Sequence, residues 1–285
     1  MEPPSLDEYT DISYVPSEPP NNFQSFDIYI PIPRVTSDEQ PHGPPPLICF
    51  IHGGAWRKED KLDHTGLARR LASFTGYVVA VPNYRLSTME DNAIRHPDHA
   101  KDILRFLEFV ITWGGPHGTT VYNSNRLCLM GHSCGAHMLS SIFLEVAQGE
   151  NPLRPSAELL KSTNAIIMSE GIYDIDLLLS SFPTYRTWFI EAAFGQRSTY
   201  GEASVTKMNP RVEYDHLQWL IVHSKGDTLV DEAQSEAMYQ HLLRHVPHVT
   251  RNFGELVEEH NDILKGVEFV KLVGQYIIDH VSPCT

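Results

Sequence analysis

The stretch Gly131-His132-Ser133-Cys134-Gly135 follows the apolar run Leu127-Cys128-Leu129-Met130 and precedes a helix-forming run that starts at Ala136. This order predicts a strand, a sharp turn and a helix. Glycines on both sides of such a turn let strand and helix approach closely, and the turn exposes the central serine as a nucleophile. A Gly-x-Ser-x-Gly pattern also arises by chance, so its context has to decide its meaning.

The composition of the chain narrows the classes of function. Its 285 residues and 41% hydrophobic content fit one large α/β domain spanning 1–285. The formal net charge of −14, with no block of lysine and arginine, argues against a nucleic acid or an anionic membrane as partner. The cysteines show no paired spacing, which indicates a reducing compartment and no metal bound through sulfur; they are Cys49, Cys128, Cys134 and Cys284.

The N-terminal sequence is unlike a targeting segment. Residues 1–17 contain proline, acidic residues and tyrosine where a signal peptide needs a basic start and an apolar stretch. No segment approaches the roughly 18 apolar residues that span a bilayer. We therefore expect a cytoplasmic protein with an irregular segment at 1–22. The sequence leaves the oligomeric state open, a homodimer included.

From about Phe23 onward, short β-rich runs alternate with longer amphipathic runs. This alternation predicts right-handed crossovers and a mostly parallel central sheet with helices on both faces. The predicted strands are Phe26–Ile30 at an edge, Leu47–Ile51, Tyr77–Val81, Arg126–Met130, Asn164–Met168, Trp219–His223 and Thr250–Gly254. The predicted helices are His64–Ser73, His99–Trp113, Ala136–Glu150, Asp231–Arg244 and Asn261–His280.

One stretch, 174–215, is too long for an ordinary connection. We predict a helical excursion over the C-terminal edge of the sheet. Two interpretations remain open: an inserted helical pair with its own small core, or a cap-like lid or substrate wall. The aromatic residues that serve either purpose are Tyr185, Trp188, Phe189, Phe194 and Tyr200.

A serine nucleophile needs a histidine to take its proton and a carboxylate to orient that histidine. On a strand-to-helix elbow these partners usually follow in the order acid, then histidine, after later strands. Asp227 comes after the strand predicted at 219–223, and Gly226 permits the loop geometry, so Asp227 is the favoured acid. His260 follows one strand later and is the favoured base. The alternative acids are Asp174, Asp176 and Asp231.

The run His52-Gly53-Gly54-Ala55-Trp56 comes directly after a predicted strand. We expect the amides of Gly54 and Ala55, together with that of Cys134, to stabilise the oxyanion of an acyl-transfer intermediate. A plain strand-end turn is the alternative. Cys134 is disfavoured as nucleophile because the elbow projects Ser133 and turns its neighbour toward packing. His132 and His137 would not share a helical face, so no metal pair is expected there.

Together these residues resemble the α/β-hydrolase superfamily and, within it, the kynurenine formamidase (arylformamidase) branch, notably its fungal members. The resemblance covers about Ile48 to Asp262, with departures at Cys134 and in residues 1–46. It is carried by His52-Gly53-Gly54-Ala55-Trp56, Tyr84-Arg85-Leu86-Ser87, Gly171-Ile172-Tyr173-Asp174, Val222-His223-Ser224 with Asp227, and His260-Asn261-Asp262.

The resemblance implies hydrolysis of N-formyl-L-kynurenine to L-kynurenine and formate in tryptophan degradation, without a cofactor or metal. The nucleophile, acid and base of the family map onto Ser133, Asp227 and His260. Trp56 and Tyr173 are candidates to line an apolar slot for the aromatic leaving group, although both also suit a core. A carboxylesterase for short-chain or aryl esters and an inert α/β-hydrolase binding scaffold are the other hypotheses.

Overall fold

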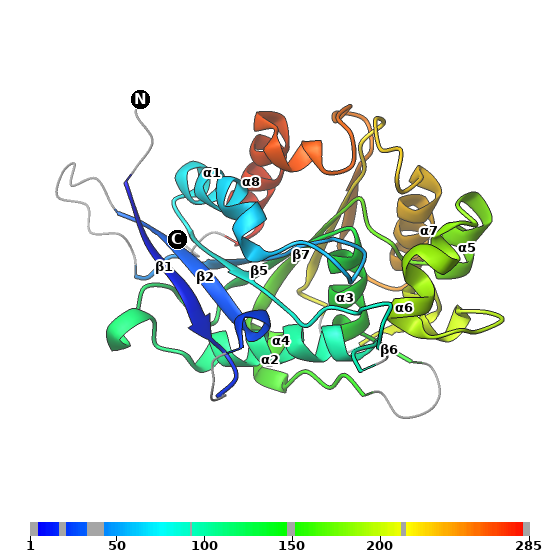
Figure 1. The fold of residues 1–285 in the computed structure, drawn as a ribbon. Coiled ribbons are helices and arrows are strands. Elements are labelled where there is room, and N and C mark those ends of the chain that lie inside the picture. Colours follow the sequence, from blue (N-terminus) through cyan, green and yellow to red (C-terminus); the bar gives the residue numbers. More distant parts are fainter. Residues whose placement is uncertain are drawn as a thin grey trace.

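The computed structural model describes residues 5–16, 21–32, 43–91, 93–146, 152–211 and 215–281. Its centre is an eight-stranded sheet with the strand order β1-β2-β4-β3-β5-β7-β9-β10 (Figure 1). Neighbouring strands from β4 to β10 are parallel, whereas β1 and β2 pair antiparallel at one edge. The predicted mostly parallel sheet is therefore confirmed.

The predicted strands are all found to within a few residues. The predicted irregular segment at 1–22 is wrong for residues 6–13, which form a strand that pairs outside β2, and residues 1–4 and 17–20 lie outside the described ranges. Consequently the strand predicted at the edge lies inside the sheet. The strands of the main sheet are β1 (Leu6–Ser13), β2 (Ser25–Pro31), β3 (Leu47–Ile51), β4 (Val78–Pro82), β5 (Leu127–His132), β7 (Thr163–Ser169), β9 (Gln218–Val222) and β10 (Val249–Asn252), while β6 (Leu144–Glu145) pairs separately with β8 (Asn209–Pro210).

The helices differ from prediction mainly at their ends. The helix after the elbow ends at Phe143 because Leu144 is extended and pairs with β8; residues 147–150 of the prediction lie outside the described ranges. The last helix starts at Val267, because Gly266 is extended and interrupts it. The helices are α1 (Thr65–Thr75), α2 (Asp98–Thr112), α3 (Cys134–Phe143), α4 (Ala157–Ser162), α5 (Ile175–Ser181), α6 (Glu191–Phe194), α7 (Glu232–Leu243) and α8 (Val267–Val281).

Helices cover both faces of the sheet. Figure 1 shows α1 and α8 on one side and α2 and α3 on the other. Successive side chains of β3 enter the two cores alternately, with Cys49 on the α2 and α3 side and Phe50 on the α1 and α8 side. Cys128 is also buried, and Cys284 lies outside the described residues. None of the helices in the described ranges is long and apolar enough to cross a bilayer.

The close packing of α3 against β3 positions the elbow. A β-carbon on Gly135 would lie 2.3 Å from the carbonyl oxygen of Ile51, and one on Gly131 would lie 2.7 Å from the amide nitrogen of Ala136. Only glycine fits at either place. Because β3, β5, β7 and β9 are adjacent and parallel, the segments that follow them meet at one edge of the sheet.

Replacing Gly135 with alanine should lower the free energy of unfolding by about 1–3 kcal/mol, because the new methyl group forces α3 away from β3. Gly254→Ala is the matched control, since a β-carbon there has no heavy atom within 4 Å. The control should change stability by less than about 0.5 kcal/mol. Denaturant unfolding of both variants measures the difference, and equal losses would contradict this account of the elbow.

Candidate active site

Ser133 sits at the turn between β5 and α3 with φ 54° and ψ −121°. A non-glycine residue in this conformation is strained and needs its surroundings to hold it. The Ser133 amide donates to the carbonyl of Ser169 at 2.9 Å, and its own carbonyl accepts from the amide of Ile172 at 3.3 Å. Both bonds tie the elbow to β7 and the segment after it. Its side chain reaches a pocket at the C-terminal edge of the sheet.

Asp227 and His260 form a hydrogen-bonded pair. Nδ1 of His260 lies 2.7 Å from Oδ2 of Asp227, while Oδ1 of Asp227 accepts from the amides of Leu229 and Val230 at 2.8 and 2.9 Å. Burial opposes ionisation of Asp227, but the hydrogen bonds from His260, Glu170 and the Val230 amide together outweigh it and lower the pKa of Asp227 below its usual value. Asp227 is therefore a carboxylate, and Nε2 of His260 remains for proton transfer.

The alternative acids have other partners. Asp174 caps α5 by accepting from the amide of Leu177, and Asp176 accepts from the amide of Tyr200. Asp231 accepts from the hydroxyl of Ser181. Geometry therefore favours Asp227 as the partner of His260.

The loops that carry Asp227 and His260 are clamped to each other. The amide of Lys225 donates to the carbonyl of Leu256 at 3.0 Å, and the hydroxyl of Ser224 donates to the carbonyl of Glu258 at 2.6 Å. A β-carbon on Gly226 would lie only 2.1 Å from the carbonyl oxygen of Val257. Gly226 is therefore required for the close approach of the two loops.

A pocket of about 240 Å³ opens beside Ser133 and His260. The excursion at 174–215 supplies one wall, and the segment after β3 supplies another. Arg57 in that segment donates a hydrogen bond to the carbonyl of Trp188, which ties the two walls together. The lining residues are Gly54, Ala55, Lys58, Glu59, Ser133, Ile172, Tyr185, Trp188, Phe189, Leu229, Val230, His260 and Asn261.

The aromatic residues of the excursion fall into two groups. Tyr185, Trp188 and Phe189 line the pocket, so part of the excursion forms a pocket wall. Phe194 and Tyr200 are buried in the main core, so the excursion has no separate core among the described residues. Its role as a lid or substrate wall stays a prediction.

The segment after β3 has an unusual backbone. Gly54, Ala55 and Trp56 have φ values of 91°, 53° and 58° in succession. The amide of Trp56 donates to Sγ of Cys134 at 3.2 Å, which fastens the segment to the start of α3. Gly54 and Ala55 line the pocket beside Ser133, and Cys134 supplies the first amide of α3. The oxyanion role of these amides stays a prediction.

Cys134 is placed as a packing residue. Its side chain is fully buried. Burial raises the pKa of the Cys134 thiol to about 12, so the thiol stays protonated at neutral pH and is a poor nucleophile.

Trp56 and Tyr173 do not line the pocket, which corrects the prediction that they contact substrate. Both are fully buried. Trp56 packs behind the pocket wall against His137, Phe189 and Phe194, so it supports Phe189 rather than the ligand. Tyr173 donates its amide to Gln234 at 2.8 Å and covers Gly171, where a β-carbon would collide with its ring.

Several residues at the site were not predicted. Lys58, Glu59 and Asn261 line the pocket, and His132 packs on the ring of His260 at a centroid distance of 4.7 Å. Burial lowers the pKa of His132 to about 3, so it packs as a neutral ring. Glu170 also lies at this edge, directly after β7. The available signal for Glu170 was an acid two residues after the strand predicted at Asn164–Met168.

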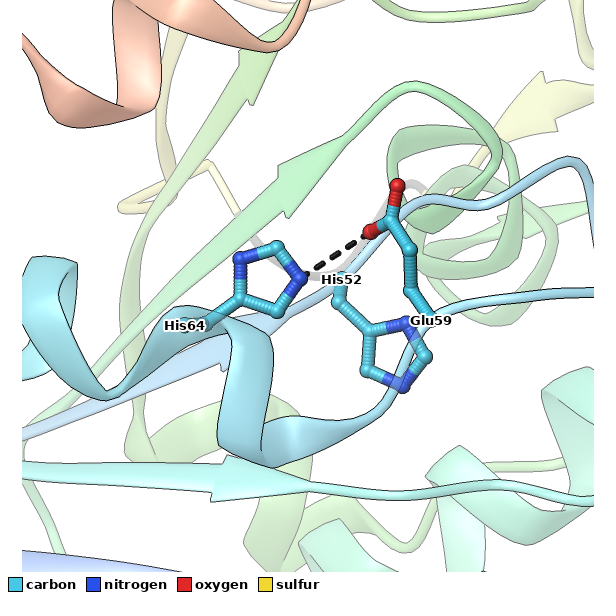
Figure 2. Close-up of side chains that lie close together, drawn as sticks. All are labelled: His52, Glu59 and His64. Carbon is cyan, nitrogen blue, oxygen red and sulfur yellow. Dashed lines mark hydrogen bonds and ion pairs between the residues drawn. The ribbon is translucent and has the colours of Figure 1, made fainter.

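His52, Glu59 and His64 cluster next to the pocket (Figure 2), with candidate ligand atoms within 4.8 Å of one another. Nε2 of His64 lies 3.0 Å from Glu59. The ring planes of His52 and His64 are 13° from parallel, and their centroids are 5.5 Å apart. We interpret the cluster as hydrogen-bonded packing.

Glu170, His223 and Asp227 form a second such cluster. Both carboxyl groups already accept hydrogen bonds from backbone amides. A proton, rather than a metal ion, can therefore link the side chains of this cluster.

Comparison with known proteins places the chain in a family. The BD-FAE family matches residues 26–242. The chain belongs to this family, which is of the α/β-hydrolase type. It is 30% identical over 203 residues to the kynurenine formamidase of Meyerozyma guilliermondii, covering 68% of this chain and 70% of that protein.

Other proteins to which this BD-FAE chain is similar include esterases. It is 28% identical to a probable isoprenylcysteine alpha-carbonyl methylesterase of Oryza sativa subsp. japonica, covering 74% of this chain and 49% of that protein. Among solved structures, esterase B of Lactobacillus rhamnosis superposes with a TM-score of 0.71 at 18% identity, covering 96% of this chain and 84% of the other. The chain is thus a hydrolase of the α/β-hydrolase type.

Replacing Ser133 or His260 with alanine should lower turnover by several orders of magnitude with little change in stability, because a triad acts as a unit. Asp227→Asn should also be severe, and Asp231→Asn is its matched control. Steady-state kinetics and fluorophosphonate labelling measure these effects. Turnover within tenfold of wild type in Ser133→Ala or His260→Ala would contradict the assignment of these residues. Normal turnover in Asp227→Asn would assign the role of the acid to Asp174, Asp176 or Asp231 instead.

Proposed function

We propose that this chain is a serine hydrolase of aryl formamides that converts N-formyl-L-kynurenine to L-kynurenine and formate. The observation that carries the proposal is that Ser133 and His260 share a pocket with the aromatic wall of Tyr185, Trp188 and Phe189. Such a wall suits the planar ring of an aryl leaving group. The similarity to a kynurenine formamidase of Meyerozyma guilliermondii supports the same substrate class.

The reaction follows from the roles of the three residues. Oγ of Ser133 attacks the formyl carbon while Nε2 of His260 takes its proton, and Asp227 stabilises the imidazolium. The amides of Gly54, Ala55 and Cys134 hold the oxyanion. The C–N bond then breaks, His260 returns the proton to the departing aryl amine, and the formyl group stays on Ser133. Water activated by His260 releases formate and restores the serine.

The size of the pocket favours a small substrate. Its volume of about 240 Å³ lies below the range of roughly 300–1,000 Å³ typical of drug-sized ligands. A single ring with a formyl group suits this space, whereas a long isoprenyl chain does not. The second candidate function, a carboxylesterase for short-chain or aryl esters, fits the same pocket and is favoured by the esterase relatives.

Glu59 gives the pocket a negative charge. Burial raises the pKa of Glu59, but its hydrogen bond with His64 and the neighbouring histidines outweigh this and lower the pKa below its usual value, so Glu59 is ionised at neutral pH. Figure 2 shows one carboxylate oxygen directed at His64 and the other away from it. That second oxygen is available to an ammonium group such as the α-amino group of N-formyl-L-kynurenine.

A side-by-side assay on N-formyl-L-kynurenine and p-nitrophenyl acetate tests the proposed function. We expect a higher kcat/KM on the formamide, because the aromatic wall and Glu59 contact its leaving group. A far higher specificity constant on the ester would support the carboxylesterase instead. Loss of both activities in Ser133→Ala would show that both belong to this site.

Replacing Glu59 with glutamine should lower kcat/KM on N-formyl-L-kynurenine by roughly tenfold, mainly through KM, because a charge-assisted hydrogen bond is lost. Formanilide, which has the formamide and ring but no ammonium group, is the matched control and should be unaffected. An equal loss on both substrates would show that Glu59 shapes the loop rather than binding the ammonium group.

A further inference from the structure

Glu170 is a buried acid next to the triad that the reaction above does not use. It directly follows β7 and is fully buried, with φ 51°. Its amide donates to the carbonyl of Val222 at 3.1 Å, and its Oε1 accepts from the amide of Ser224 at 2.8 Å. These bonds fix Glu170 between the ends of β7 and β9. A strained non-glycine residue held this firmly is often found where function requires it.

The other oxygen of Glu170 faces the triad acid. Candidate ligand atoms of Glu170, His223 and Asp227 all lie within 4.8 Å of one another. Oε2 of Glu170 is buried and lies 3.3 Å from Nδ1 of His223 without hydrogen-bond geometry. That nitrogen is 3.0 Å from the hydroxyl of Ser235, which is its nearer partner. Asp227 is therefore the acceptor still available to Glu170.

Two carboxyl groups this close do not both ionise in a buried site, so they share a proton. Asp227 already accepts from the amides of Leu229 and Val230 and faces Nδ1 of His260, all of which favour its charged form. Glu170 accepts from one amide only. The proton therefore belongs on Glu170. Burial and the neighbouring Asp227 raise the pKa of Glu170 to about 11, in agreement with this placement.

We propose that Glu170 is protonated in the working enzyme and donates a hydrogen bond to Asp227, which positions that carboxylate for His260. Glu170 is then a positioning residue, because it acts through Asp227 and touches no substrate. Glu170 keeps its proton through the catalytic cycle. Glu170 and Asp227 together therefore carry one negative charge, which balances the one positive charge of the His260 imidazolium. The proposal rests on the proposed triad but not on the identity of the substrate.

The pH dependence of stability tests for the proton on Glu170. The unfolded chain releases this proton near the ordinary glutamate pKa of 4.5, whereas burial and the neighbouring Asp227 hold the pKa of Glu170 in the folded chain far above that value. Within that window the folded state holds one more proton, so wild-type stability falls as pH rises. Glu170→Gln removes this effect. The groups facing Glu170 (Asp227, His223 and Tyr173) remain in both proteins.

Denaturant unfolding of both proteins from pH 6 to pH 9 gives the equilibrium constant of folding for each. The quantity compared is the wild-type constant divided by the constant of Glu170→Gln. We expect this ratio to fall about tenfold per pH unit. A ratio that does not change with pH would show that Glu170 is ionised in the folded protein and would overturn the proposal.

The positioning role is tested by comparing Glu170→Gln with Glu170→Met. Glutamine keeps a carbonyl for the Ser224 amide and a donor for Asp227, so the rate of fluorophosphonate labelling of Ser133 should stay within roughly threefold of wild type. Methionine has a similar length but no donor, and labelling should slow by about tenfold or more through misplacement of the triad. On a substrate, kcat should fall while KM stays nearly constant.

The outcomes separate this proposal from the proposed function. If wild type is not labelled, the triad itself is wrong. If wild type and folded Glu170→Met are labelled equally fast, the triad stands and the positioning role is wrong. A purely structural role would lower the stability of Glu170→Met without slowing the reaction of its folded fraction.

Discussion

The close contact between α3 and the ends of β3 and β5 is the constraint on which the site depends. Gly131 and Gly135 allow it, because any side chain there would collide with backbone atoms. The contact leaves the intervening Ser133 in a left-handed conformation and brings the segment after β3 against the start of α3. The positions of the predicted nucleophile and of the predicted oxyanion amides are thus consequences of one packing interaction rather than separate features.

The charge state of each acid at the site follows from its burial and from the hydrogen-bond donors next to it. Asp227 is surrounded by hydrogen-bond donors and stays charged, whereas Glu170 has one amide and stays protonated. Glu59 is only partly buried and ionises beside His64. Three acids in one small region therefore take three different roles, set by the burial, the hydrogen-bond donors and the neighbouring charges around each carboxyl group.

The order of motifs along the chain predicted the fold well. It also singled out Asp227 and His260, which form a hydrogen-bonded pair, and Ser133, which shares a pocket with His260. The central strands were found because a fully buried parallel strand is a continuous apolar run, as in β3 and β5. The strand at 6–13 was missed because it alternates polar and partly buried residues at an exposed edge. Trp56 was misassigned because an aromatic residue beside a glycine turn suits a core and a pocket equally, and sequence contains no information on which side of the loop it lies.

The sequence by itself determined the elbow, the order of the predicted acid and base, and a sheet covered by helices on both faces. Glycine positions and apolar runs set these features because their effects are local in the chain. The sequence favoured Asp227 as the acid, and only the tertiary structure showed that it meets His260 while Asp174, Asp176 and Asp231 have other partners. The tertiary structure also decided that Tyr185, Trp188 and Phe189 face the pocket while Trp56 and Tyr173 do not. Contacts between segments far apart in the chain set these outcomes, and no local pattern encodes them.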